Sequence, residues 1–328
     1  MIRTFLSLLF RIVITVREYL YSIGVLRSYK VDAKVISVGN IAVGGAGKTP
    51  LVLLLNERLR NRGYKTAILE KGYKSGLRHN EIVLAEKGRD SLREDIIGDE
   101  PAMIWEQIPM GTRLAVCNDK TKAAISVKKM WPDTNAIIID DGFQHLKLKR
   151  DVDIVLIDAS LGIKDKLVPL GKLREPYSSL KRANIVLFTK SDGMTEEEKD
   201  VLKDKVLAIN PELKVFFSVV KFITSMPIKG KRVFPVSAIY NPIHFHRKIK
   251  EAGAEFEKHM SFPDHYKFTQ SVFDQIMKTA SRGGAEYIIV TSKDWGKIKP
   301  FIGENHNIIE AWYEHQINSE GEFLKCCM

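Results

Sequence analysis

The stretch that decides the fold reads Val35-Ile-Ser-Val-Gly-Asn-Ile-Ala-Val-Gly-Gly-Ala-Gly-Lys-Thr-Pro-Leu-Val-Leu-Leu-Leu55. It contains an apolar run, a glycine-rich segment and the start of a helix pattern, which is the order that a phosphate-binding loop requires. Gly44, Gly45 and Gly47 have no Cβ, so the backbone can bend tightly and turn its N–H groups toward an anion. The stretch therefore predicts a strand, a phosphate-binding loop and a helix in succession.

The same loop supplies side chains for a nucleotide and its metal ion. We expect Lys48 to reach the β- and γ-phosphates and Thr49 to offer its hydroxyl group to Mg²⁺. Ala46 belongs to the loop, and Pro50 fits the first helical turn because residues there need no intrahelical N–H bond. Ala42 stands where the strict pattern has glycine. A glycine-rich turn followed by an accidental Gly-Lys-Thr is therefore the alternative at this point.

A second acidic motif follows a buried strand pattern. The apolar run 136–139 ends in Asp140-Asp141-Gly142. An aspartate at such a strand end can hold Mg²⁺ opposite the serine or threonine of a phosphate-binding loop. The alternative is an ordinary turn, since Asp-Gly is common in turns.

Strand and helix patterns alternate along the chain, and this alternation predicts a mostly parallel sheet with ligands at the carboxyl ends of its strands. We expect a P-loop NTPase-type α/β fold with helices on both faces of the sheet, followed by a smaller α/β domain. The expected divisions are an N-terminal membrane-associated helix over 1–27, a core domain over 28–220, and a second domain over 221–328 that begins with a linker at 221–231. The predicted strands are 35–38, 65–69, 82–84, 114–117, 136–139, 153–157, 184–188, 214–219, 232–236, 255–259 and 287–290, and the predicted helices are 51–62, 102–107, 120–130, 195–209, 242–251 and 270–281.

Composition limits the function classes. The 328 residues suggest about two domains, and 45% hydrophobic with 28% charged residues is an ordinary globular composition. Lys and Arg exceed Asp and Glu by 51 − 40 = 11, which favours anionic partners such as nucleotides, phosphorylated substrates or acidic lipid surfaces. No basic block with interleaved aromatic residues indicates a nucleic-acid site, and no obligate protein partner is inferred. The three cysteines show no metal spacing and favour a reducing compartment.

The N-terminal residues 4–26 are strongly apolar but are interrupted by charges. These charges break any apolar run of about 20 residues, so we expect no transmembrane helix. Arg3, Arg11 and Arg17 beside leucine and aromatic residues favour a helix that lies in a membrane interface. The alternative is a helix that packs on the core of the protein.

Three further segments carry candidate residues. Asp99 precedes a helix pattern and has the place of a cap or a first-turn acid. The loop at 169–176 carries Lys172 and Arg174, of which arginine is the better bidentate phosphate ligand. His265 lies in a loop between proline, aspartate and aromatic residues, where turn chemistry and proton transfer are both open.

Taken together, these motifs resemble the tetraacyldisaccharide 4′-kinase family, the lipid A 4′-kinases of Gram-negative envelopes. The resemblance covers most of the chain, and it includes a non-glycine residue where Ala42 stands. The matching segments are Gly39–Pro50, Gly98–Pro101, Asp140–His145, Gly171–Pro176, Phe262–Tyr266 and Thr291–Lys297.

The chain departs from the family pattern at two places. The family usually has Ser/Thr-Arg-Gly-Tyr where this chain has Glu70-Lys71-Gly72-Tyr73, and it usually has arginine where Lys120 stands. If these positions bind phosphates, lysine keeps the positive charge but loses the bidentate fork of arginine. The roles of Lys71 and Lys120 therefore stay open.

The resemblance implies phosphoryl transfer from ATP to the 4′-hydroxyl of an acylated glucosamine disaccharide 1-phosphate. Such catalysis consists mostly of positioning and charge stabilisation. Lys48 and the amides of the phosphate-binding loop would hold ATP, and Thr49 with Asp140 would set Mg²⁺. Asp141, also counted among the catalytic residues, and Glu100 are close candidates for the metal.

The remaining roles also come from the resemblance. Asp99 and His265 would form an acid–base pair that removes the hydroxyl proton, in a cleft between the two domains. Arg174, Gln144 and His145 would bind the substrate. The family is membrane-associated, so the resemblance implies a peripheral or monotopic enzyme at an anionic membrane surface, on the cytoplasmic face of the inner membrane.

Two other classes of function are possible from the sequence. Residues 189–192, Thr-Lys-Ser-Asp, follow a strand and are similar to the guanine-reading motif of GTPases, and Val236-Ser237-Ala238 is similar to the element that supports it. A structural role as a strand end and helix cap is the alternative for residues 189–192. A peripheral membrane scaffold with an inactive phosphate-binding loop is the third possibility.

Overall fold

The computed structural model describes residues 2–72, 77, 81–163, 166–239, 242–263, 266–303 and 307–328. The chain forms two compact units, one of residues 1–220 with 315–328 and one of residues 221–314. The last 14 residues thus return to the first unit, whereas the sequence analysis assigned all of 221–328 to the second domain. The N-terminal helix also belongs to the first unit.

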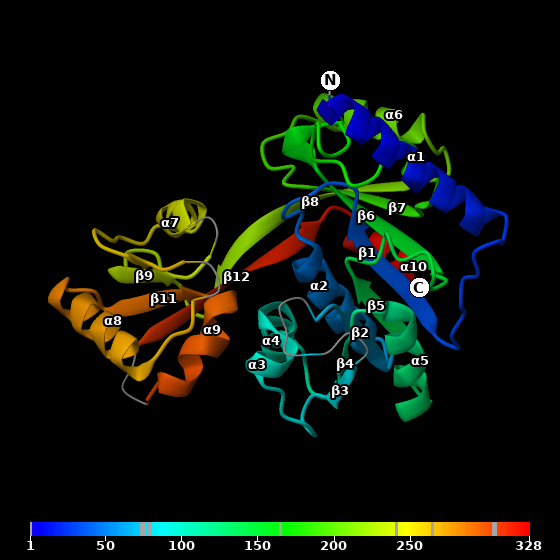
Figure 1. The fold of residues 1–328 in the computed structure, drawn as a ribbon. Coiled ribbons are helices and arrows are strands. Elements are labelled where there is room, and N and C mark those ends of the chain that lie inside the picture. Colours follow the sequence, from blue (N-terminus) through cyan, green and yellow to red (C-terminus); the bar gives the residue numbers. More distant parts are fainter. Residues whose placement is uncertain are drawn as a thin grey trace. The chain divides into compact units, whose positions relative to one another are not determined.

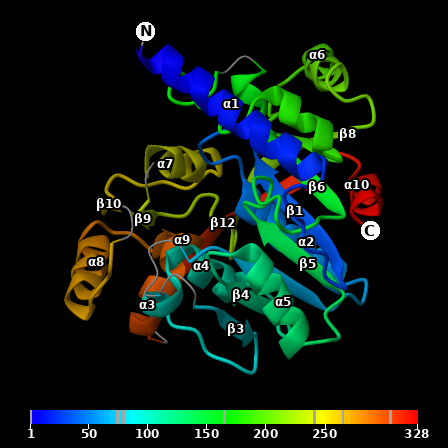
Figure 2. The same ribbon diagram turned by 45° about the vertical axis from the view of Figure 1, so that its right-hand side comes forward.

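The first unit contains a mostly parallel sheet (Figures 1 and 2). From β8 to β3, each strand pairs in parallel with the next, except that β4 and β3 are antiparallel. From β8, which is followed by β12 (Ile308–Ile317) on its other side, to the edge strand β3, the order is β8 (Lys214–Thr224), β7 (Ile185–Thr189), β6 (Val152–Asp158), β1 (Lys34–Asn40), β5 (Ala136–Asp140), β2 (Thr66–Glu70), β4 (Arg113–Val116) and β3 (Val83–Glu86). This arrangement confirms the predicted α/β fold class.

Helices cover both faces of this sheet. Ile36 and Val38 of β1 belong to one apolar cluster with α2, while Val35, the residue before Ile36, belongs to another cluster with α5. This division follows from the alternation of side chains along a strand. The helices of the unit are α1 (Ile2–Ser22), α2 (Lys48–Arg60), α3 (Glu94–Ile97), α4 (Asp99–Gln107), α5 (Lys120–Met130), α6 (Glu196–Leu207) and α10 (Glu320–Cys327), with short 3₁₀ turns at Ala159–Leu161 and Tyr177–Arg182.

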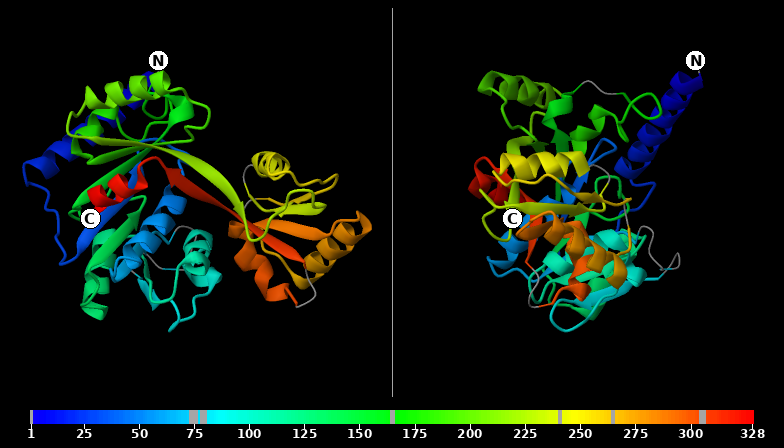
Figure 3. Two further views of the ribbon diagram at one scale, coloured as in Figure 1. Left: turned by 180° about the vertical axis from the view of Figure 1, so that it is seen from behind. Right: turned by 90° about the vertical axis from the view of Figure 1, so that its left-hand side faces the viewer.

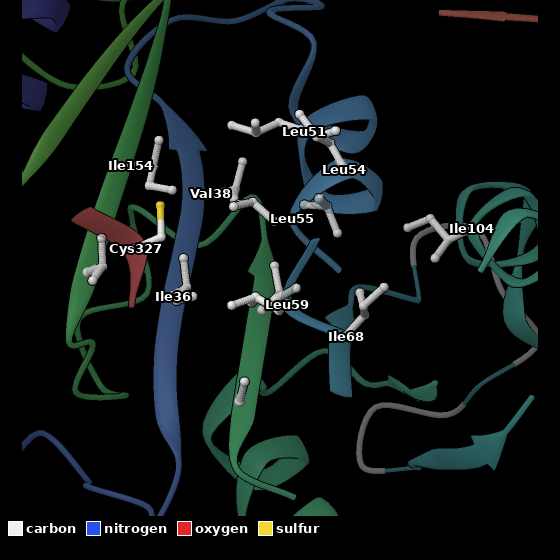
Figure 4. Packing of buried hydrophobic residues seen from close by; sticks show 14 of the residues in the cluster. Ile36, Val38, Leu51, Leu54, Leu55, Leu59, Ile68, Ile104, Ile154 and Cys327 are labelled. Atoms are coloured by element: carbon white, nitrogen blue, oxygen red, sulfur yellow. The ribbon is translucent and has the colours of Figure 1, made fainter. Parts of the chain in front are cut away.

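Helix α2 begins three residues earlier than the pattern 51–62 predicted. Its N-cap is Gly47, in the left-handed conformation with φ 84°, so Lys48, Thr49 and Pro50 form the first helical turn. Pro50 is tolerated there because the first-turn amides have no partner within the helix. The helix packs its leucines against β1, β2 and α4 (Figure 4), and these contacts fix where its N-terminus lies.

Helix α1 has two different faces. Ser7 and Ile14 are buried, and the Ser7 hydroxyl donates a hydrogen bond to the backbone oxygen of Leu167. Large apolar side chains at the i, i+4, i+7 and i+11 spacing of the other face are exposed, among them Phe5, Leu9, Ile12 and Val16. No helix in the described part of the chain is long and apolar enough to cross a membrane.

The second unit is a smaller α/β unit. Its strands, in order, are β10 (Met260–Ser261), β9 (Val233–Ser237), β11 (Tyr287–Thr291) and β12 (Ile308–Ile317), and their pairings are parallel. Two apolar clusters divide its helices, with α7 (Pro242–Glu251) in one and α8 (Gln270–Arg282) and α9 (Ser292–Ile298) in the other, and a 3₁₀ turn at Lys299–Phe301 follows.

Two sequence predictions about this unit were wrong. Residues 255–259 do not form a strand, because Glu255 makes only an isolated bridge with Arg232 and most of the segment is charged and exposed. The proposed linker 221–231 begins as strand, because β8 continues to Thr224 and Phe222 packs against the core of the second unit. Strand β12, which the sequence patterns did not indicate, and β8 each contain residues of both units (Figure 3).

Arg182 links three segments of the first unit. Its guanidinium donates hydrogen bonds to Glu18 of α1, to the buried Glu175 and to the backbone oxygen of Phe143, whose ring lies 3.7 Å from the guanidinium carbon. Burial raises the pKa of Glu175, and Arg182 opposes this shift. The arginine therefore offsets part of the cost of burying this carboxylate.

We expect Arg182→Ala to destabilise the fold by about 3 kcal/mol, because it leaves the carboxylate of Glu175 buried without its partner. Denaturant unfolding measures the loss, and Lys181→Ala, which changes an exposed neighbouring cation, is the control. Equal stability of the two variants would show that Arg182 contributes no more than a surface charge.

Candidate active site

The phosphate-binding loop lines a cavity of about 510 Å³ in the first unit. Gly44, Gly45, Ala46, Gly47, Lys48, Thr49 and Pro50 form one wall, and the other walls are Glu70, Glu100, Met103, Asp140, Asp141 and Arg174. The free amides at the start of α2 lie at this wall, together with the positive end of the helix dipole. The cavity thus combines an anion-binding backbone with four carboxylates and two cations.

The two aspartates of the Asp-Asp-Gly motif make different contacts. The hydroxyl of Thr49 donates a hydrogen bond of 2.9 Å to Asp140 Oδ2, which joins the loop to the end of β5. Asp141 accepts a hydrogen bond of 3.0 Å from Arg174, and its other oxygen lies 3.4 Å from Lys48 Nζ. The structure therefore brings together five predicted site residues from three segments of the chain.

The backbone around these aspartates is held tightly. The amide of Asp141 donates to Asp140 Oδ1 at 2.7 Å, and Asp141 has a positive φ of 49°. The amide of Gly142 donates to Val38 of β1, and a Cβ on Gly142 would lie 2.6 Å from the hydroxyl of Ser37. Glycine is thus required where the motif turns back over the neighbouring strand.

The structure shows what Lys120 contacts at one of the two positions where the chain departs from the family pattern. Lys120 is 1% exposed, and its ammonium donates to the backbone oxygens of Leu69 at 2.9 Å and Asp140 at 2.8 Å. These oxygens belong to the carboxyl ends of two neighbouring strands. Lys120 therefore binds backbone in this structure and places a buried positive charge behind the aspartates.

The pKa shifts reflect this arrangement. Burial raises the pKa of Asp140, and the positive charges of Lys120 and Lys48 oppose the shift. Burial also acts on Asp141, but Lys48 and Arg174 outweigh it and lower the pKa of that carboxyl group. Asp141 is therefore ionised, and the buried Asp140 gains from a nearby cation.

Glu70 is a residue to which the sequence analysis gave no role. It ends β2, is 4% exposed and lines the cavity, and burial raises its pKa to about 8. Its Oε1 accepts the amide of Lys71, while Oε2 has no hydrogen-bond partner among the residues that the structure describes. The signal in the sequence was the glutamate where the family usually has serine or threonine, but only the fold shows that it faces the nucleotide loop.

The other predicted site residues differ in whether they line the cavity. Asp99 and Glu100 form the first turn of α4, as expected for a first-turn acid, and Glu100 lines the cavity. The amide of Gln144 donates to the backbone oxygen of Asn40, so this side chain supports the loop. His145 is half-buried, and burial with the charge of Lys120 lowers its pKa to about 4. His265 lies outside the described residues.

The segment that is similar to a guanine-reading motif has structural partners. Thr189 ends β7, as the structural alternative predicted, and Lys190 pairs with Asp158. The hydroxyl of Ser191 donates to the backbone oxygen of Ser218 on β8. The N-cap of α6 is Thr195, so the predicted cap lies three residues beyond the segment.

Comparisons with known proteins agree with the site. A sequence model of the family described as Tetraacyldisaccharide-1-P 4′-kinase matches residues 2–325. The chain is 33% identical to the Tetraacyldisaccharide 4′-kinase of Halothermothrix orenii, over 94% of this chain and 86% of that protein. It is 34% identical to the protein of the same name from Desulfotalea psychrophila, over 91% and 88%.

A solved structure is also similar. The LpxK of Aquifex aeolicus in complex with ATP superposes with a TM-score of 0.78 at 26% identity, over 99% of this chain and 98% of that one. These matches confirm the resemblance found in the motifs and do not favour the GTPase alternative. Because the similarity extends over nearly the whole length, the chain belongs to the tetraacyldisaccharide 4′-kinase family and is an ATP-dependent kinase of lipid A biosynthesis.

Proposed function

We propose that the cavity over the phosphate-binding loop is where the γ-phosphoryl group of ATP passes to the 4′-hydroxyl of an acylated glucosamine disaccharide 1-phosphate. The observation that carries the proposal is the pairing of Thr49 with Asp140 beside the pairing of Lys48 and Arg174 with Asp141. Phosphoryl transfer needs such a cluster of oxygen ligands and cations around one phosphate site.

Thr49 and Asp140 are the proposed holders of Mg²⁺, with Glu100 at the cavity wall. Among the described residues, no three His, Cys, Asp or Glu side chains converge closely enough to enclose a metal ion. This fits Mg²⁺, which binds through one or two carboxylates and otherwise through phosphate oxygens and water. When bound, the metal would neutralise charge on the phosphates. The raised pKa of the buried Asp140 supports this assignment, because a cation would stabilise the charged form.

Lys48 and Arg174 are the proposed phosphate ligands. Both now contact Asp141, whose side chain is 42% exposed. Phosphate oxygens in the cavity would offer them a second set of acceptors, and the planar guanidinium of Arg174 suits bidentate binding. Asp141 then acts to keep both cations aimed at the cavity before the nucleotide binds.

Asp99 and His265 are the proposed acid–base pair for the acceptor hydroxyl. Asp99 lies in the first turn of the helix that also carries Glu100 to the cavity wall. A carboxylate that orients an imidazole and supports its cation is a common device for removing a hydroxyl proton. Gln144 and His145 remain proposed substrate-side residues, on the loop that follows the metal-binding aspartate.

The exposed apolar face of α1 is the proposed membrane contact, at the cytoplasmic face of the inner membrane. The acceptor is a lipid, and the net charge of +11 favours an anionic surface. Arg17 of α1 donates to the backbone oxygen of Gln144, which fixes the helix to the active-site loop. A helix that lies in the interface would thus keep the catalytic unit beside its substrate.

For the reaction itself, we expect the purified protein to phosphorylate the disaccharide lipid in the presence of ATP and Mg²⁺, and chelation of the metal to stop turnover. Asp99→Ala should lower kcat by at least a hundredfold, because the hydroxyl would lose its base system. Asp95→Ala, which removes an exposed acid on α3, is the control. Unchanged turnover in the Asp99 variant would exclude this residue from catalysis.

For Glu70, we expect the stability of the Glu70→Gln variant, relative to that of the native protein, to increase as pH rises. The folded-state pKa of about 8 lies above the ordinary value of 4.5, so the folded state holds this proton longer than the unfolded state does. Stability therefore falls as pH rises between these values, and glutamine removes that loss. Thermal melts in chelator at about pH 5 and about pH 8 measure the difference, with Glu57→Gln as an exposed control. A difference that does not change with pH would contradict the assignment.

For the membrane contact, we expect replacement of Phe5, Leu9, Ile12 and Val16 by serine to weaken binding to anionic vesicles by roughly tenfold or more. Each apolar side chain buried in the interface contributes about 1.5–3 kcal/mol. Vesicle flotation measures the bound fraction.

A fourfold replacement of exposed apolar residues elsewhere in the same unit by serine, at Met110, Ile125, Met130 and Val201, is the matched control. Equal binding of both variants and the native chain would place the membrane contact elsewhere.

A further inference from the structure

His315 lies behind the phosphate-binding loop and has no part in the proposed reaction. It belongs to the part of β12 that returns to the first unit, and it is 2% exposed. Its Nε2 lies 2.8 Å from the backbone oxygen of Gly47, and its Nδ1 lies 2.9 Å from the hydroxyl of Ser218 on β8. A buried histidine thus connects the loop to a neighbouring strand through two short contacts.

The contacts fix the tautomer of the ring. A backbone carbonyl can only accept, so Nε2 must carry the hydrogen that is donated to Gly47. In the neutral ring Nδ1 is then an acceptor, and the Ser218 hydroxyl donates to it. Burial lowers the pKa of His315, in agreement with a neutral ring. Ser218 is itself held in place, because its backbone oxygen accepts from the amide and the hydroxyl of Ser191.

The carbonyl of Gly47 belongs to the peptide that leads into Lys48. In a planar trans peptide the C=O and N–H groups point in opposite directions. A carbonyl held toward His315 therefore directs the amide of Lys48 away from the histidine, at the wall of the cavity that residues 44–50 form. Such oriented amides are what an anion-binding loop uses to hold phosphate.

Close packing at Gly47 supports a specific fit. A Cβ at this position would lie 2.7 Å from His315 Nε2 and 2.9 Å from Cε1, which is too close for any side chain. The Gly47 oxygen also accepts a hydrogen bond from the amide of Leu51 at 3.3 Å, a longer bond of the first helical turn. The imidazole is thus the nearer donor to this carbonyl.

We propose that His315, oriented by Ser218, is a positioning residue for ATP, which holds the Gly47–Lys48 peptide in the orientation that binds phosphate. This inference rests on the proposed place of the ATP phosphates at the loop. His315 acts through backbone and touches no reacting atom. It should therefore affect the affinity for ATP more than the chemical step or the binding of the lipid.

The test compares His315→Leu with His315→Gln in the full-length protein. Leucine removes the N–H donor, and glutamine can still present one near the position of Nε2. We expect ATP binding, measured by calorimetry with ATP alone, to weaken about tenfold in the leucine variant and by less than about threefold in the glutamine variant. Ser218→Ala should fall between them. The KM for ATP should rise in the same order, while the KM for the lipid and kcat change little.

Lys48→Ala separates failure of this inference from failure of the proposed function. If Lys48→Ala leaves ATP affinity unchanged, ATP does not bind at this loop and both proposals are overturned. If Lys48→Ala weakens ATP but His315→Leu does not, only the role of His315 is overturned. Equal weakening by the leucine and glutamine variants, with native melting temperatures, would mean that ring shape and not the donor matters, and would also overturn it. If the leucine variant fails to fold, Ser218→Ala is compared with the glutamine variant. Weaker ATP binding in Ser218→Ala than in the glutamine variant would support the proposal, and equal binding in the two would overturn it.

Discussion

The parallel register between β1 and β5 is the constraint on which the candidate active site depends. Val38 pairs with Asp140, so the chain leaves both strands at the same edge of the sheet, one into the phosphate-binding loop and the other into Asp141. The Thr49 hydroxyl then reaches Asp140 across that edge. A shift of one residue would turn Asp140 to the other face of the sheet, because side chains alternate along a strand. The site is therefore set by backbone pairing before any side chain contributes.

The second constraint is charge. Asp140 and Glu70 are buried at neighbouring strand ends, and burial raises the pKa of both. Lys120 supplies a buried positive charge, but its ammonium donates hydrogen bonds to backbone oxygens and not to the two carboxylates. Its charge therefore lowers their pKa values through space. A site with this excess of buried acid and a phosphate-binding loop would be stabilised by the proposed divalent cation together with a nucleotide. The complex of the Aquifex aeolicus LpxK with ATP agrees with the nucleotide part of this expectation.

Local signals predicted much of this molecule, and long-range contacts account for the rest. Helices α5 and α7 occupy the predicted residues 120–130 and 242–251, because each has a clear apolar spacing and a clear end. The phosphate-binding loop and the Asp-Asp-Gly motif were found by spacing alone. Strand β12 was missed because glutamates and an aromatic pair interrupt its apolar pattern, and one of its two strand neighbours, β8, lies far away in the sequence. Glu70 could be noticed as unusual, but its place in the cavity follows only from the strand order.

Gly47 shows how these two kinds of information meet at one residue. Its left-handed backbone conformation favours glycine for a local reason, and the glycine-rich motif predicts it from the sequence. The second demand comes from His315, 268 residues away along the chain, whose ring fills the space that a Cβ would need. Two separate reasons thus require glycine at position 47, the left-handed backbone and the close approach of His315. The same close approach places a hydrogen-bond donor at the Gly47 carbonyl, behind the phosphate site. The precision of the loop is then a property of the sheet around it as much as of its own sequence.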